Sequence, residues 1–173
     1  RYNQLKEWNV PEDTHHYIFS GNLYPLIAEL VENVKLESSF AGTFVGHKLK
    51  FVEGHYKKGE KFDYFQIKEL FEFLKKENLT VDLAVYMLPV LYENPRMDFE
   101  SILTRIGFER MSPRDILSKI RFLSDKFDQI KRKKAEKHKI NWLMGQLRKQ
   151  AVGNMQLTEL LKEIRKQVQA GSE

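Results

Sequence analysis

Basic side chains gather in the last third of the chain, where their types and spacing suit the binding of phosphate. Ammonium and guanidinium groups bind phosphate oxygens through charge and hydrogen bonds, and they displace the counterions that surround a nucleic acid. A run of basic residues ends at Lys139, and two further pairs follow in the sequence. The candidate RNA-binding residues are Lys131, Arg132, Lys133, Lys134, Lys137, Lys139, Arg148, Lys149, Arg165 and Lys166.

The charge of the chain is divided unevenly between its two parts. The net charge is +5, but residues 1–109 hold 13 Lys and Arg against 17 Asp and Glu, a balance of −4. Residues 110–173 hold 16 against 7, a balance of +9. Such a division indicates that the C-terminal part faces a polyanion. The alternative is a basic face that only keeps the helices solvated.

No pattern of catalytic or metal-binding residues stands out. His15 and His16 are adjacent, so on a helix their side chains diverge by about 100° and do not easily share one metal. His47 and His55 have no carboxylate at a matching spacing. The sequence contains no H-E-x-x-H, P-loop or G-x-G-x-x-G motif. We therefore predict no catalytic residue, metal or cofactor in these 173 residues.

Composition limits the class of protein. Hydrophobic residues make up 42% of the chain, which is enough for a packed core. There is no cysteine, so disulfides and cysteine-ligated metals are excluded and a cytoplasmic setting is favoured. No apolar run approaches the roughly 18 residues of a membrane span, so we expect no membrane contact. Because the chain begins at Arg1, we interpret it as a piece of a longer protein.

The spacing of apolar residues predicts an all-α fold, because it is helical nearly everywhere and strand alternation is absent. In the first part, Asp63 and Thr80 are predicted N-caps, Pro89 should kink or end its helix early, and Gly107 should stop the last one. The aromatic residues at helical spacing are predicted core positions: Phe65, Phe71, Phe73, Tyr86 and Phe99. The predicted helices of this part span about 23–34, 40–52, 64–74, 83–91 and 99–106.

The C-terminal part is predicted to be a three-helix subdomain. Ser112 should cap a helix that has Pro113 in its first turn and runs to Ile130. Two more helices, at about 138–151 and 156–169, should meet at a tight turn where Gly153 and Asn154 tolerate a positive φ. Gly145 lies in mid-helix, and we predict that another helix passes too close there to admit a Cβ. The predicted domains are 1–109 and 110–173.

One stretch of the C-terminal part resembles a known family. Asn141-Trp142-Leu143-Met144-Gly145-Gln146-Leu147, with Gly153 and Leu160-Leu161 after it, is similar to the end of the B and E subunits of glutamyl-tRNA(Gln) amidotransferase. In this family, the C-terminal end is a helical tail whose last part is a YqeY-like module. Residues 65–71, 83–84 and 98–108 follow the family's upstream helices more loosely, so the resemblance extends over nearly the whole chain.

The resemblance implies a role without chemistry for this fragment. In the family, the catalytic body activates misacylated Glu-tRNA(Gln) with ATP and Mg²⁺ and amidates it, and a partner glutaminase subunit supplies the ammonia. The tail grips the outer corner of the tRNA. ATP, Mg²⁺ and the glutaminase subunit would therefore belong to the parent protein, and the tail would bind tRNA.

Two other hypotheses remain open from the residues alone. The aromatic N-terminal part could dock a protein partner, with the basic tract merely solubilising. A small independent enzyme would require His15, His16 or His47 to converge in a pocket.

Overall fold

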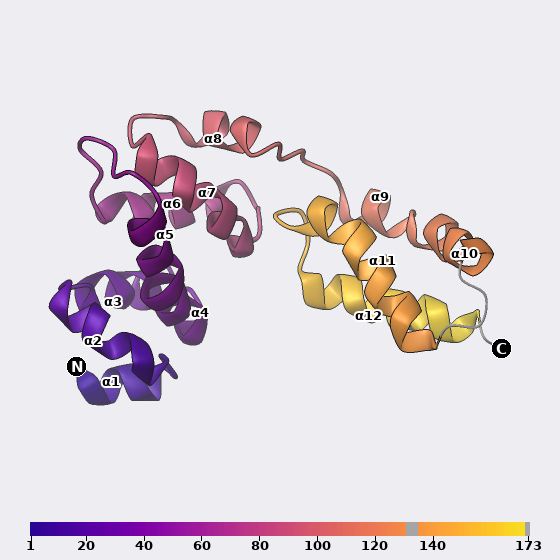
Figure 1. The fold of residues 1–173 in the computed structure, drawn as a ribbon, viewed down its shortest axis with the longest axis horizontal. Helices are drawn as coiled ribbons and strands as arrows, with labels where there is room; N and C mark the ends of the chain where they lie inside the picture. Colours follow the sequence, from indigo (N-terminus) through magenta and orange to yellow (C-terminus); the bar gives the residue numbers. More distant parts are fainter. Residues whose placement is uncertain (131–134, 172–173) are drawn as a thin grey trace. The chain divides into compact units, whose positions relative to one another are not determined.

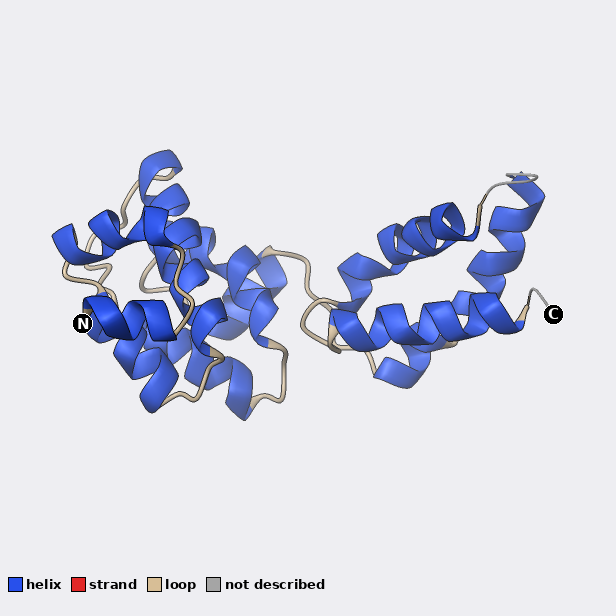
Figure 2. Ribbon diagram, turned by 90° about the horizontal axis from the view of Figure 1, so that it is seen from below, coloured by secondary structure: helices blue, strands red, loops and turns tan. Residues whose placement is uncertain are grey.

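The protein is all-α, as the apolar spacing predicts. A computed structural model describes residues 1–130 and 135–171, and within these ranges the chain forms helices, turns and loops without a β-strand (Figures 1 and 2). The described chain divides into two compact units, Arg1–Ile106 and Gly107–Glu173. Gly107 to Glu109, which the sequence analysis assigned to the first part, thus belong to the second unit.

Unit 1 packs short helices around a core of leucine, isoleucine and phenylalanine. Phe71, Leu70 and Met87 are among its fully buried side chains, so α6 and α7 supply much of this core. Its elements are α1 (Tyr2–Glu7), η1 (Glu12–Thr14), α2 (His15–Ser20), α3 (Tyr24–Glu32), α4 (Ser38–Thr43), η2 (Phe44–Leu49), α5 (Lys50–His55), α6 (Phe65–Lys76), η3 (Val81–Leu83), α7 (Ala84–Glu93) and α8 (Phe99–Arg105).

One helical run, α4–η2–α5, contains a π-helical segment that the sequence does not predict. The Glu37 carboxylate caps its start by accepting hydrogen bonds from the backbone N–H groups of Ser39 and Phe40, at 3.0 and 2.8 Å. The six residues of η2 have π geometry, which is rare and is often found at functional sites. The predicted helix at 40–52 is therefore present but locally widened.

Two predicted helix ends in unit 1 have different outcomes. Gly107 adopts φ +75° directly after the C-cap of α8, so the predicted stop is confirmed. Pro89 does not end its helix early, since α7 continues to Glu93, and the alternative of a kink stays a prediction. Pro89 cannot donate to the carbonyl of Val85, but the buried Leu88 and Leu91 on either side hold the helix in the core.

Unit 2 consists of α9 (Pro113–Leu117), α10 (Ile120–Ile130), α11 (Glu136–Ala151) and α12 (Leu157–Ala170). The predicted cap is confirmed, because the Ser112 hydroxyl accepts from the Asp115 N–H at 3.1 Å. The predicted single helix from Ser112 to Ile130 is broken after Leu117. Lys119 lies at this break, and its Nζ donates to the side chain of Gln150 at 2.9 Å, which fixes the start of α10 against the end of α11.

In the turn between α11 and α12, Gly153 and Asn154 have different roles. The predicted turn is present: Gly153 has φ +89°, whereas Asn154 does not have a positive φ. Asn154 is fixed instead by side-chain hydrogen bonds: its Nδ2 donates to the Glu109 and Gln150 carbonyls and its Oδ1 accepts from the Met111 N–H. The α11–α12 hairpin packs on α9 and α10 through Ile116, Ile120, Leu143, Leu147, Ala151, Met155, Leu160, Ile164 and Val168.

Candidate nucleic-acid interface

Six of the ten predicted RNA-binding residues can be placed in the structure. Lys131, Arg132, Lys133 and Lys134 lie outside the described residues. The other six occupy α11 and α12 of unit 2: Lys137, Lys139, Arg148 and Lys149 on α11, and Arg165 and Lys166 on α12.

The basic residues of α11 lie outside its buried face. Leu143, Leu147 and Ala151 are buried and define the inner face of this helix. At about 100° per residue, Lys137 and Arg148 point in nearly the same direction, roughly 16 Å apart along the axis and about a quarter of a turn from the centre of the inner face, and Lys149 points to the opposite side. Both are exposed, as is Lys149 beside Arg148, and none forms an ion pair with another described residue.

Lys139 has a different role in the structure. Its Nζ donates to both carboxylate oxygens of Asp128, at 2.9 and 2.8 Å, and only 16% of its side chain is exposed. The pair connects the end of α10 to the start of α11. The Lys139 charge is therefore largely neutralised inside the unit and contributes less to an outer field than its position in the sequence suggests.

Gly145 is exposed, which contradicts the predicted close approach of another helix. A Cβ built at this position would meet no atom within 4 Å, counting all atoms outside its own helical turns and chain neighbours. The prediction fails because Gly145 lies on the outer face of α11, one turn before Arg148 and Lys149 and two turns after Lys137. The backbone at Gly145 is therefore exposed to solvent between Lys137 on one side and Arg148 and Lys149 on the other.

The outer face of α12 carries one basic residue that the sequence analysis missed. Leu160, Ile164 and Val168 are its buried residues. Lys162 is exposed and precedes Arg165 and Lys166 by three and four positions, a spacing that brings their side chains together on a helix. That spacing was visible in the sequence, but the dense basic run at 131–139 obscured it.

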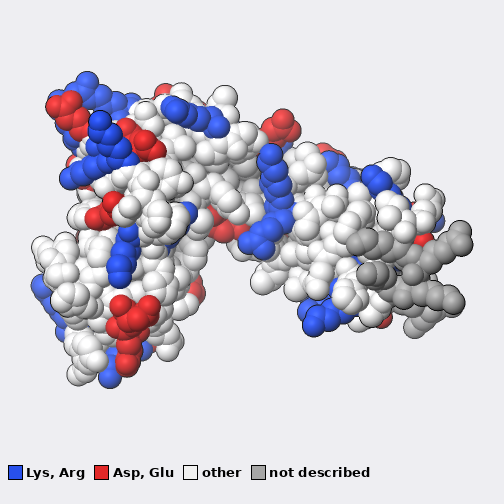
Figure 3. Space-filling view, viewed as in Figure 1, with Lys and Arg blue, Asp and Glu red and all other residues white. Residues whose placement is uncertain are grey.

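Helix α10 adds exposed groups that were also missed. Arg121 and Lys126 are exposed, and Phe122 between them is 70% exposed. Figure 3 shows Lys and Arg side chains as separate patches on the visible face of unit 2, whereas acidic and basic groups intermingle on unit 1. Unit 2 thus presents basic faces on several helices.

The histidines do not converge. His15 is buried, with its Nε2 3.1 Å from the Val10 carbonyl oxygen, and His16 is exposed. The His47 Nε2 lies 3.1 Å from Asp13 Oδ2 at the surface. Among the described residues, no three histidine, aspartate or glutamate side chains are placed to hold a metal ion.

The chain matches no protein-family model, no curated protein and no solved structure. Within residues 1–130 and 135–171, no helix has the length and apolar character needed to cross a membrane.

Proposed function

We propose that this chain is a tRNA-binding tail of a glutamyl-tRNA(Gln) amidotransferase subunit and that unit 2 carries the contact with RNA. Recognition is electrostatic and shape-based, through the outer face of α11, the basic stripe of α12 and the run at 131–134. The chemistry, ATP, Mg²⁺ and the glutaminase partner belong to the parent protein, which acts in the cytoplasm. The resemblance at residues 141–161 and the +9 balance of the C-terminal part support this proposal.

The observation that carries the proposal is the bare backbone at Gly145. Glycine in the middle of a helix costs about 1 kcal/mol relative to alanine, and no neighbour among residues 1–130 and 135–171 requires it here. A glycine that packs against nothing, flanked by Lys137, Arg148 and Lys149, allows a phosphate backbone to approach the helix closely. Contacts of this kind position an RNA without reading its sequence.

The test is a titration of tRNA at several salt concentrations. The variant Lys137→Ala/Arg148→Ala/Lys149→Ala removes three charges from the α11 face, and Lys57→Ala/Lys58→Ala/Lys76→Ala removes three exposed charges from unit 1 as a control. Each phosphate contact that is lost should flatten the slope of log K against log salt by roughly 0.7–0.9. The α11 variant should therefore flatten it by about 2–3, and unrelated tRNAs should be affected equally. Equal slopes for both variants would refute the proposal.

A single substitution separates binding from stability. Gly145→Ala should strengthen α11 and, by blocking close approach, weaken tRNA binding at the same time. Binding that stays unchanged in this variant would remove Gly145 from the interface while leaving the lysine test intact.

A further inference from the structure

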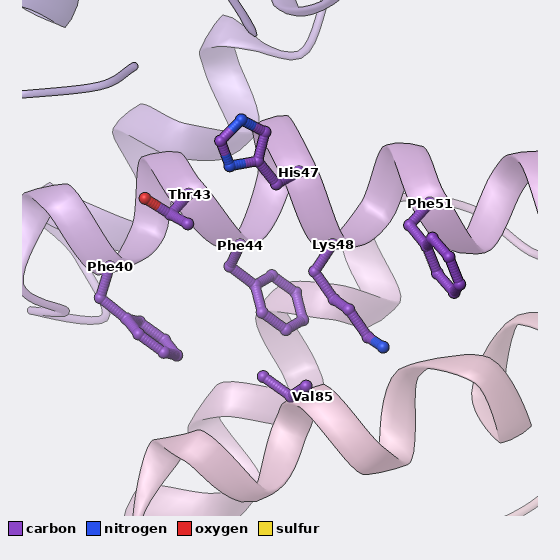
Figure 4. Close-up of a pocket in the computed structure, with 7 residues that line it drawn as sticks. All are labelled: Phe40, Thr43, Phe44, His47, Lys48, Phe51 and Val85. Carbon is purple, nitrogen blue, oxygen red and sulfur yellow. The ribbon is translucent and has the colours of Figure 1, made fainter.

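An open groove crosses one face of unit 1, and nothing in the proposed function of unit 2 uses it. One wall is the α4–η2–α5 run, from which Phe40, Phe44, Lys48 and Phe51 line the groove, and Val85 of α7 lies opposite (Figure 4). Its volume is about 490 Å³. The lining is mainly apolar, and Lys48 brings a positive charge into its middle.

The wall that carries these residues is fixed from behind. Added Cβ atoms at Gly42 and Gly46 would lie 2.4 Å from Val10 and 2.6 Å from Thr14, so the run packs tightly against the segment after α1. From the core side, the Phe71 ring makes edge contacts with Phe44 and Phe40, with centroids 4.9 and 5.9 Å apart. The groove is therefore a preformed feature of the fold.

The groove is long and continues past Lys48. A second hollow of about 470 Å³ shares Lys48 and Val85 with the first and follows α7 past Pro89 toward Arg105. Phe51 follows Phe40 by eleven positions. At the rise of an α-helix this is about 16 Å, or three turns. A trough of this length that opens to solvent suits an elongated segment of a protein better than a small molecule, which usually binds in an enclosed pocket.

Exposure and charge indicate what kind of partner fits. Phe51 and Tyr86 at the edges of the two hollows are 48% and 49% exposed. Exposed aromatic side chains grouped along a groove are typical of protein-binding surfaces. The Lys48 ammonium has no carboxylate partner among the described residues, and burial lowers its pKa. An acidic side chain from a partner could form an ion pair with the Lys48 ammonium group.

We propose that this groove binds an amphipathic α-helix of a protein partner, whose apolar stripe lies along Phe40 and Phe51, over the buried Phe44, and whose acidic side chain pairs with Lys48. Anchors at i, i+4, i+7 and i+11 of such a helix span about 16 Å, which matches a trough of three turns. This inference depends on unit 1 alone and is independent of RNA binding by unit 2.

The test selects 18-residue amphipathic helices from a displayed library against the whole chain and measures the affinities of the enriched peptides by fluorescence anisotropy. We expect Asp or Glu within their apolar stripe. Lys48→Glu should weaken binding about tenfold or more, and changing the peptide's acidic residue to Lys should restore it. Lys50→Glu makes the same charge change two residues away, on an exposed position outside the groove, and should have little effect.

Two further variants guard against effects of misfolding. Lys48→Met keeps the length of the side chain without its charge and should abolish the preference for a Glu-bearing over a Gln-bearing peptide. Phe51→Ala should weaken binding about tenfold, whereas Phe65→Ala truncates an exposed aromatic ring elsewhere on unit 1 and should not. Circular dichroism melts of all variants should match the parent chain.

Several outcomes would overturn the proposal. One is a selection that enriches no peptide, or peptides that bind the parent chain and Lys48→Glu equally. Another is Lys48-dependent binding of laurate without any peptide binding, which would assign the groove to a small anionic amphiphile. Self-association that Lys48→Glu abolishes would assign it to a second copy of the chain.

Discussion

Alanine introduced at helical glycines should change the stability of this protein in opposite directions, according to what lies next to each glycine. Gly145 is exposed on α11, and an added Cβ would meet nothing within 4 Å. Alanine there gains helix propensity without a clash, so the free energy of unfolding of unit 2 should rise by about 0.5–1 kcal/mol. For a domain of this size, the melting temperature should rise by roughly 3–6 °C.

Gly46 in η2 should respond in the opposite sense. Its Cβ would lie 2.6 Å from Thr14 Cβ and 2.8 Å from Thr14 Cγ2 and Oγ1. Thr14 is 1% exposed, and its hydroxyl donates to the Pro11 carbonyl at 2.6 Å, so it has little room to move. Overpacking of this kind costs about 1–3 kcal/mol against a propensity gain of about 1 kcal/mol. We expect Gly46→Ala to lower the stability of unit 1 by up to about 2 kcal/mol.

The two tryptophans make the assay specific for each unit. Trp8 lies in unit 1 and Trp142 in unit 2, so Trp142→Phe and Trp8→Phe backgrounds report urea unfolding of unit 1 and unit 2 separately. Gly54→Ala is the matched control for Gly46→Ala, because it lies in the same helical run with nothing within 4 Å of its added Cβ. Gly54→Ala should stabilise unit 1. A destabilising Gly145→Ala, or Gly46→Ala and Gly54→Ala with the same sign, would refute the reasoning.

Two predictions concern pH. Burial and the nearby Glu53 carboxylate raise the pKa of Tyr64 to about 12, so its phenol should ionise later than an ordinary tyrosine in an absorbance titration. In the unfolded chain, the Tyr64 side chain ionises near pH 10.0, so its contribution to the stability of unit 1 is fully present below that pH and is lost as the pH rises toward about 12. Tyr64→Phe should reduce this loss. At the start of α8, hydrogen bonds from the Ser101 N–H and hydroxyl lower the pKa of Asp98 below 3.8. The Asp98 carboxylate stabilises unit 1 above pH 3.8, and this stabilisation is lost as the pH falls through the lowered pKa. In urea unfolding, Asp98→Asn should therefore lose less stability in acid than the parent chain.

The helix start at Ser112 and the helix stop at Gly107 were predictable because their signals are local. The Ser112 hydroxyl accepts from the N–H group three residues later, and Gly107 turns the chain one residue after the C-cap of α8, so each signal acts within a few residues. Positions that depend on tertiary packing were harder to predict. The apolar spacing placed Phe65 and Tyr86 in the core with Phe71, yet only Phe71 is buried. Helical spacing alone does not distinguish an inner stripe from an exposed aromatic position.

The groove of unit 1 could not be predicted from the sequence for a related reason. Phe40, Phe44 and Phe51 recur at the spacing of an ordinary core stripe. In the structure only Phe44 of the three is buried, and Gly42 and Gly46 bring the opposite side of the run against Val10 and Thr14. These contacts join residues more than thirty positions apart, and no local rule specifies them. The π-helical segment between the phenylalanines was equally invisible to a pattern based on a uniform period.

Gly145 shows how a wrong structural prediction can still direct attention to a surface position. A glycine in mid-helix has a cost in stability, which requires a close neighbour either inside the chain or outside it. The sequence could not separate these cases, and the structure excludes a neighbour within the described chain. The outer face on which Gly145 lies carries Lys137, Arg148 and Lys149 without carboxylate partners among the described residues. A neighbour that approaches this backbone must therefore be compatible with three positive charges, and a phosphate chain meets that requirement.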